Sequence, residues 1–162
     1  MCEIREVKVA AASLIPLISE LFEHGQNSRI AVSGDSMYPF LRHRIDCVEC
    51  TKGSFDQLSR GDIVLIQRTN GGYILHRVYR KKKDCFFMVG DAQQWIEGPL
   101  YPEQLLAVVT VIWRKDKRIA CSNMWWRLLS GLWLYLRPFR YFILKVYGKL
   151  AIAKIKAPSE FT

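Results

Sequence analysis

Short apolar runs separated by turn residues occupy positions 28–122, and this texture constrains the fold more than any other feature of the sequence. Such runs are typical of β-strands, because a helix needs a longer stretch with a 3.6-residue period. Asn70-Gly71-Gly72 lies between two of the runs and is a strong hairpin signal. We therefore predict a mainly β domain over residues 28–122. Its strands are expected at 29–32, 45–50, 62–68, 73–80, 85–89, 105–113 and 118–121, with a loop over 92–104.

Helices are expected on both sides of this β domain. Residues 7–24 place apolar side chains on one wide stripe at helical spacing, and Gly25-Gln26-Asn27 ends that pattern. The segment 1–27 is therefore predicted to be an amphipathic helix. Residues 123–162 are rich in aromatic, leucine and basic residues, and they are predicted to form a basic, hydrophobic helical tail. A chain of 162 residues holds one such domain with short additions.

The cysteines and histidines predict neither a metal site nor a cofactor. The five cysteines are an odd set without the dense spacing of a disulfide scaffold, which favours reduced thiols. Cys47 and Cys50 form a CxxC pair, but a second pair is missing and the chain has only three histidines. A structural zinc site needs four converging ligands. We expect these cysteines to be small apolar residues in strands.

Ser36 lies in a tight turn within the stretch Val32–Pro39, after an apolar strand and before a proline. A serine hydroxyl is a weak nucleophile, so chemistry at Ser36 needs a base that accepts its proton. His24 lies at a helix end and His43 in an Arg-His-Arg turn, where solvated surface positions are expected. His76 lies inside a predicted strand, and a shared sheet is able to hold it beside Ser36.

Four short motifs follow one another along the domain. They are Ser33-Gly34-Asp35-Ser36-Met37-Tyr38-Pro39, Arg60-Gly61-Asp62-Ile63-Val64, His76-Arg77-Val78 and Gly90-Asp91. Over residues 31–113 this series resembles the successive conserved boxes of the signal peptidase I superfamily, which includes the SOS-repressor autoproteases. Each motif is short, and their order carries the resemblance.

The resemblance implies a mainly β serine endopeptidase whose nucleophile is Ser36. Histidine before Arg-Val, here His76, is similar to the endoplasmic-reticulum type of signal peptidase, whereas bacterial enzymes have lysine at that position. Asp91 is then the acid expected to orient His76, with Asp62 as a competing acid. A histidine of near-neutral pKa accepts the serine proton and returns it to the leaving amine.

The sequence departs from the family's pattern in two ways. Asp35 stands directly before Ser36, as in the SOS-repressor branch, where signal peptidases usually have Ser-Gly-Ser. Ser33 is thereby displaced as a side-chain donor, and the backbone N–H groups of Ser36 and Met37 are expected to form the oxyanion hole. The N-terminal segment also shows no convincing transmembrane helix and no cleavable signal peptide, and it is too short for a repressor's DNA-binding domain.

The net charge of +9 is concentrated in the tail, where residues 124–162 hold seven Lys or Arg against one acid. Trp and Tyr cluster in the same segment, and these side chains favour the lipid–water boundary. The basic residues recur too often for a comfortable membrane span. Residues 124–150 are therefore expected to lie on a membrane surface as interfacial helices, with packing against the β domain or a partner as the alternative. The expected localisation is membrane-associated, on a side that the sequence does not determine.

Three functions agree with these patterns. The leading prediction is a serine endopeptidase that cleaves a signal or leader segment from precursor proteins. The second keeps the chemistry and takes the leader of a small modified peptide on the cytoplasmic side as substrate. The third is a membrane-surface or nucleic-acid-binding module in which Ser36 is an ordinary turn residue. The basic run Lys81-Lys82-Lys83 is expected to be a solvated turn, so nucleic acid is not an expected partner.

Overall fold

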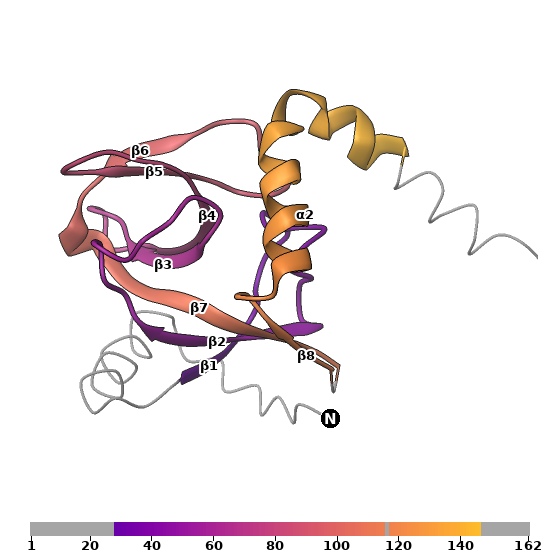
Figure 1. Ribbon diagram of the computed structural model, residues 1–162, viewed down its shortest axis with the longest axis horizontal. Coiled ribbons are helices and arrows are strands. Elements are labelled where there is room, and N and C mark those ends of the chain that lie inside the picture. Colours follow the sequence, from indigo (N-terminus) through magenta and orange to yellow (C-terminus); the bar gives the residue numbers. More distant parts are fainter. Residues whose placement is uncertain (1–27, 116, 147–162) are drawn as a thin grey trace, which may run out of the picture.

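An eight-stranded antiparallel sheet forms most of the computed structural model, which describes residues 28–115 and 117–146. The strand order is β1-β2-β7-β3-β4-β5-β6, with β8 paired to β7. The sheet is strongly curved, so that β5 and β6 lie on one side of β3 and β4, with β7, β2 and β1 on the other (Figure 1). The mainly β prediction is confirmed, while the predicted helix over 1–27 lies outside the described residues.

The strands follow the predicted runs closely. They are β1 Ser28–Ala31, β2 Asp46–Lys52, β3 Ile63–Gln67, β4 Tyr73–Lys81, β5 Phe86–Val89, β6 Glu97–Leu100, β7 Leu105–Arg114 and β8 Lys117–Ala120. The helical elements are η1 Pro102–Gln104, α2 Met124–Tyr135, η2 Arg137–Phe139 and a helical stretch at 140–146.

The hairpin between β3 and β4 has the predicted turn. Arg68 N donates to Gly72 O at 2.7 Å, and Asn70 Oδ1 accepts from Gly72 N at 3.1 Å. Gly71 has a φ of 81°, which favours a residue without a side chain. The turn therefore sets the register in which Val64 pairs with His76.

Strand β6 lies inside the segment predicted to be a loop. Its sequence, Glu-Gly-Pro-Leu, contains two residues that are depleted in strands. Proline is tolerated at the edge of a sheet, and β6 is the edge strand beside β5. The pairing of Phe86 with Leu100 and of Met88 with Glu97 forms this strand, and local sequence does not signal it.

The core consists of two apolar clusters on opposite faces of β3. Ile63 and Leu65 belong to the first cluster, with residues of the serine turn, β2 and β7. Val64 and Ile66 belong to the second, with residues of β4, β5 and β6. Because β3 is buried on both faces, its sequence is a continuous apolar run without alternation.

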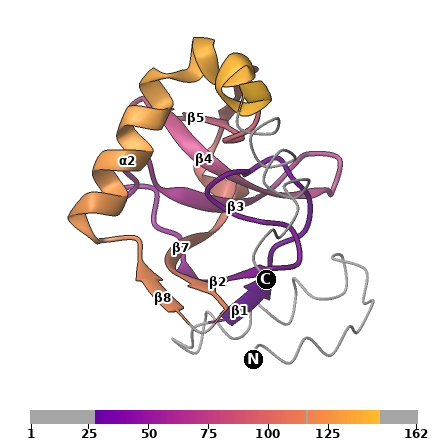
Figure 2. The same ribbon diagram turned by 90° about the vertical axis from the view of Figure 1, so that its right-hand side faces the viewer.

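Helix α2 stands against one end of the curved sheet (Figures 1 and 2). Asn123 caps its start, where Oδ1 accepts from the backbone N of Trp125 and of Trp126. The inner face of the helix buries Trp133 and Leu134. Within the described part of the chain, no helix has the length and apolar character needed to cross a bilayer.

Candidate active site

The serine turn is a rigid loop between β1 and β2. Tyr38 N donates to Asp35 O at 3.1 Å, which closes the turn around Ser36. Gly34 has a φ of 88° and donates its N–H to His43 Nδ1 at 2.8 Å. His43 therefore holds the start of the turn, and Ser36 itself is half-buried.

The two backbone donors predicted for an oxyanion hole are available. The N–H groups of Ser36 and Met37 donate to no acceptor among residues 28–115 and 117–146. The Met37 side chain is 2% exposed and packs in the first core cluster, which fixes the backbone beside it. Two unpaired donors at a fixed turn suit an oxygen that gains negative charge.

A second turn, residues 90–93, packs directly on Ser36. Ala92 N donates to Ser36 O at 2.8 Å. A Cβ at Gly90 would lie 2.7 Å from Ser36 O and 2.7 Å from Gln93 Oε1. The absence of a side chain at Gly90 therefore allows the two turns to meet.

His76 lies opposite Gly90, the residue at which the two turns meet. Arg77 pairs with Val89 across β4 and β5, and one residue further along the same register Gly90 lies opposite His76. Residues opposite each other in an antiparallel pair share a face. The face from which His76 projects is thus the one on which Ser36 O contacts Gly90.

The imidazole of His76 is buried without a hydrogen bond. Its side chain is 1% exposed, and neither Nδ1 nor Nε2 has a partner in the described structure. The structure therefore brings the backbone of Ser36 to Gly90, the residue opposite His76, and it does not form the expected hydrogen bond between Ser36 Oγ and His76. Buried polar groups without partners are rare and require a physical reason.

Asp91 does not orient His76, and this corrects the prediction drawn from the motif. Its carboxylate accepts from Arg77 Nε at 2.9 Å and from Arg77 Nη2 at 2.7 Å. Alternation along the strands explains the pairing, because Arg77 and Asp91 project from the face opposite to that of His76. Both side chains of this ion pair are 0% exposed.

Asp62, the competing acid, has a structural role. Asp62 Oδ2 accepts from Ser59 N at 2.7 Å and so shapes the turn before β3. Gly61 in the same turn has a φ of 96° and accepts from Arg77 Nη1 at 2.8 Å. His24 lies outside the described residues.

Glu97 is the carboxylate beside His76, and the sequence reading missed it. Glu97 Oε2 lies 3.9 Å from His76 Nδ1, longer than a hydrogen bond. Arg68 donates to both oxygens of this carboxylate through Nε and Nη2. Because β6 was predicted to be loop, no signal in the sequence placed Glu97 on the inner face of the sheet.

Burial sets the charge state of His76. Removal from water lowers the pKa of its imidazole from 6.5 to about 4, while the negative charges of Glu97 and Asp91 act in the opposite direction and Arg68 adds to the lowering. His76 is therefore neutral at pH 7, which is the state that accepts a proton.

The C-terminal helices clamp the 90–93 turn from behind. Trp133 Nε1 donates to Asp91 O at 2.9 Å, and Arg140 Nη1 donates to Gly90 O at 2.9 Å and to Gln93 O at 3.1 Å. Arg140 is 0% exposed. The tail thus belongs to the structure that positions Ser36. Beside the turn, a groove of about 690 Å³ lies between Ala92, Trp95, Tyr141 and Phe142.

The cysteine pair lies within strand β2. Cys47 and Cys50 are buried, and burial raises the pKa of the Cys50 thiol to about 12, so the thiol stays protonated. No group of three or more His, Cys, Asp or Glu side chains in residues 28–115 and 117–146 is arranged to hold a metal ion.

Asp91→Asn is expected to destabilise the fold by about 3 to 5 kcal/mol, because it leaves the buried guanidinium of Arg77 without its charge partner. The double substitution Arg77→Met/Asp91→Leu should cost less than Asp91→Asn, since it removes both charges. Urea unfolding followed by tryptophan fluorescence measures the difference. The exposed Asp84→Asn serves as control, and a loss below about 1 kcal/mol for Asp91→Asn would contradict the assigned pairing.

The lowered pKa of His76 predicts a loss of stability in acid. Between pH 6.5 and about 4 the unfolded chain binds a proton at this residue and the folded chain does not. The free energy of unfolding should therefore contain a contribution of about 3 kcal/mol that is present above pH 6.5 and is lost as the pH falls to about 4. Urea unfolding at several pH values should show a weaker pH dependence for His76→Leu. Equal dependence in both proteins would contradict the burial of a neutral imidazole.

Comparison with known proteins neither supports nor contradicts the resemblance drawn from the motifs. Scans against family models, curated proteins and solved structures found no match to this chain. The relation to signal peptidases therefore stays a prediction from the four ordered motifs.

Proposed function

We propose that this chain is a serine endopeptidase in which Ser36 is the nucleophile and His76 the proton acceptor. The observation that carries the proposal is the buried, unpaired imidazole of His76 opposite Gly90, the residue against which Ser36 O packs. An unpaired buried imidazole costs the fold free energy, and a role in a reaction accounts for its presence. The signal-peptidase-like identity of the domain is part of the same proposal.

The proposed reaction proceeds through an acyl-enzyme. Ser36 Oγ attacks the scissile carbonyl while its proton passes to His76 Nε2. The N–H groups of Ser36 and Met37 stabilise the oxyanion that develops. His76 then gives the proton to the leaving amine, and water releases the acyl group by the same steps. Asp91 acts through the fold, because its carboxylate is engaged by Arg77.

The reaction requires His76 and Ser36 Oγ to come within about 3 Å of each other when substrate binds. Hydrogen bonds between catalytic groups are often long in unliganded enzymes and shorten in the substrate complex. The exposed side of the Ser36 turn and the groove beside Ala92 leave room for an extended peptide.

The substrate class is a signal or leader segment, for which the groove supplies an apolar surface. Trp95, Tyr141 and Phe142 line it and suit the hydrophobic part of such a segment. Leaders of small modified peptides remain the second substrate class. Cleavage of one precursor type and not the other by the purified protein separates the two.

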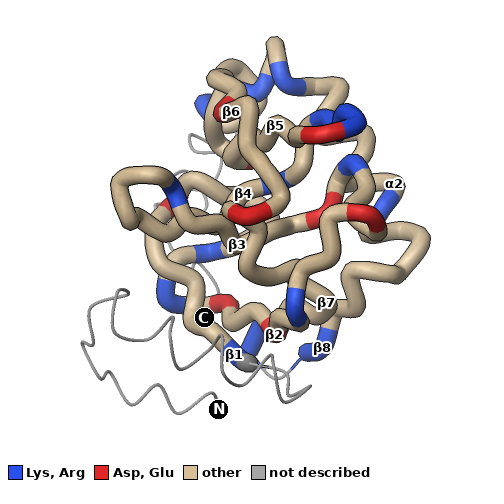
Figure 3. Tube along the Cα trace, turned by 90° about the vertical axis from the view of Figure 1, so that its left-hand side faces the viewer, with Lys and Arg blue, Asp and Glu red and all other residues tan. Residues whose placement is uncertain are grey.

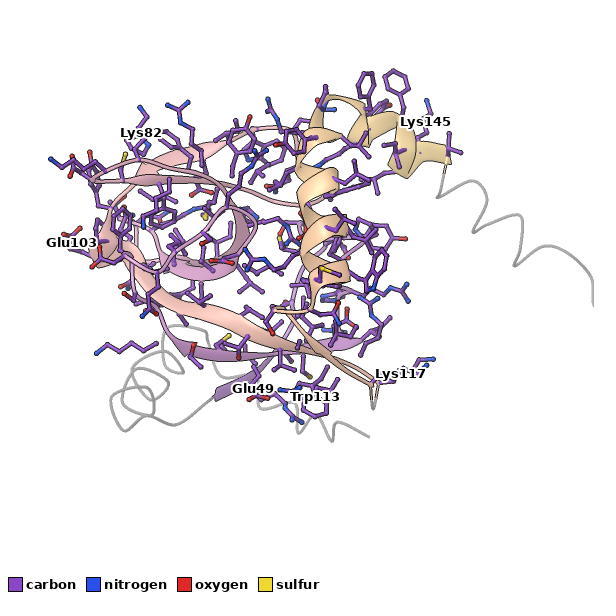
Figure 4. All side chains as sticks on the ribbon, viewed as in Figure 1. Glu49, Lys82, Glu103, Trp113, Lys117 and Lys145 are labelled. Carbon is purple, nitrogen blue, oxygen red and sulfur yellow. The ribbon has the colours of Figure 1, made fainter. Side chains whose placement is uncertain are left out.

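We also propose that the tail binds the surface of a membrane. Ten of the fourteen exposed large apolar side chains in the described structure belong to residues 124–146. Trp125, Leu128, Leu132 and Tyr135 form one stripe along the outer face of α2. Besides the buried Arg140, residues 124–146 carry three basic side chains, Arg127, Arg137 and Lys145, and no acid, which complements anionic lipid. Lys145 lies at the far end of these helices and Glu103 at the opposite end of the sheet (Figure 4).

A nucleic-acid-binding module is the less favoured alternative. In the view of Figure 3, segments of Lys and Arg lie among segments of Asp and Glu along the trace, whereas a nucleic-acid interface favours a clustered basic stripe. The apolar stripe of α2 suits lipid better than phosphate, because none of its four side chains carries a positive charge.

Ser36→Ala is expected to abolish labelling by a fluorophosphonate probe and to reduce cleavage of leader peptides by at least about a thousandfold. The probe forms a bond between Ser36 Oγ and phosphorus while fluoride leaves, and intact-mass measurement detects the adduct. Ser33→Ala, in the same turn and exposed, is the matched control and should retain labelling. Full cleavage activity in Ser36→Ala would overturn the proposed function.

The tail proposal predicts binding to vesicles that contain phosphatidylglycerol and weaker binding to phosphatidylcholine alone. The double substitution Trp125→Ser/Leu132→Ser should weaken binding by roughly tenfold or more, because both side chains leave the apolar stripe. Ile45→Ser, at an exposed apolar residue outside the tail, is the control and should bind normally.

Co-sedimentation with vesicles measures this binding. Equal binding by the stripe variant and the wild type would contradict the proposal. A second outcome would also contradict it: the wild type is a dimer without affinity for lipid, and the stripe variant is a monomer. A second copy of the chain would then cover the stripe.

A further inference from the structure

Glu97, Arg68 and His76 lie together on the face of the sheet that carries the second core cluster. The carboxylate of Glu97 receives two hydrogen bonds from Arg68 and lies 3.9 Å from His76 Nδ1. The side chain of Glu97 is 21% exposed and that of Arg68 is 40% exposed, while the imidazole is buried. The group therefore extends from the surface to the ring of His76.

Strand alternation places all three side chains on one face. Val64 pairs with His76, and Arg68 continues the same alternation of β3 beyond its end. On the other side, Glu97 pairs with Met88, whose side chain lies in the second core cluster. Glu97 thus projects from the same face as His76, whereas Asp91 projects from the opposite face.

The orientation of the ring suits proton transfer. Nδ1 faces the carboxylate, which leaves Nε2 for another partner. In Ser-His-acid arrangements the acid accepts from Nδ1–H and stabilises the imidazolium that forms when Nε2 takes the serine proton. Arg68 holds the Glu97 carboxylate in place through two hydrogen bonds.

We propose that Glu97, held by Arg68, is the residue that positions His76 for proton transfer from Ser36. The inference rests on the proposed function and replaces the acid that the sequence motif suggested. A shift of about 1 Å by the Glu97 side chain brings Oε2 within hydrogen-bond reach of Nδ1. The Nδ1–H then donates to Glu97, and the imidazolium formed on attack is paired.

The charged groups around His76 predict the direction in which a substitution of Glu97 shifts the pKa of His76. Glu97 has the largest charge effect on the pKa of His76 and raises it, Arg68 lowers it, and Asp91 raises it less. Removing the charge of Glu97 should therefore lower the pKa of His76 further. The charge of Glu97 acts on the pKa of His76 whether or not the carboxylate takes part in the reaction, so a separate readout has to follow the proton transfer.

The first experiment needs no activity. Histidine Cε1–H resonances of the free protein, titrated by NMR while the same spectra monitor folding, should give a lower pKa for His76 in Glu97→Gln than in the wild type. Glu103→Gln, at an exposed acid near η1, is the matched control and should leave the pKa unchanged. An unchanged His76 pKa in Glu97→Gln would overturn the inference.

The second experiment follows the reaction. Glu97→Gln should lower kcat by about 10²- to 10⁴-fold with little change in KM. Arg68→Lys should retain more activity than Arg68→Met, because it keeps the positive charge beside Glu97. Full kcat in Glu97→Gln, with Ser36→Ala inactive, would overturn the inference and leave the proposed function standing. Activity in Ser36→Ala would instead overturn the proposed function, and the NMR titration would still report whether Glu97 acts on His76.

A third readout comes from the phosphonylated protein, in which His76 keeps the proton that Ser36 has lost. A low-field Nδ1–H resonance is expected in the wild type, because the proton is shared with a carboxylate. The signal should vanish in Glu97→Gln and persist in Asp91→Asn at a temperature where that variant is folded. Loss of the signal in Asp91→Asn alone would assign the role to Asp91 and contradict the inference.

Discussion

The buried ion pair between Arg77 and Asp91 is the interaction on which the rest of the site depends. A charge pair without solvent exposure is stable only when every donor and acceptor is engaged. All three guanidinium nitrogens of Arg77 donate, to Asp91 and to Gly61 O, and the guanidinium carbon lies 4.9 Å from the centroid of the Phe40 ring. One guanidinium thus joins the turn before β3, the turn after β5 and the loop that carries Ser36.

The same pair determines the direction in which the side chain of His76 projects. Neighbouring residues of a strand project to opposite faces, so a pairing of Arg77 with Asp91 directs His76 away from both. The imidazole is then enclosed by apolar side chains of the second core cluster and by the Arg68–Glu97 pair. The Arg77–Asp91 ion pair and His76 thus lie on opposite faces of β4.

Much of the fold was predictable because its signals are local. The Asn70-Gly71-Gly72 turn and the continuous apolar run of β3 fix two neighbouring strands from their own residues. Alternation along His76-Arg77 and Gly90-Asp91 would also have placed Asp91 with Arg77, had strand pairing been known. Strand β6 was not predictable, because only pairing with β5 makes Glu-Gly-Pro-Leu extended. Because β6 was predicted to be a loop, the position of Glu97 beside the buried His76 was not predicted either.

The clamp formed by Arg140 has a consequence for the order of events during synthesis. The carbonyl groups of Gly90 and Gln93 receive their hydrogen bonds from a side chain made about fifty residues later. Until the ribosome has released that part of the chain, the turn that supports Ser36 lacks its backing. In a nascent chain these two carbonyl groups therefore lack the Arg140 hydrogen bonds, and the turn that donates from Ala92 N to Ser36 O is completed only after the helices are in place.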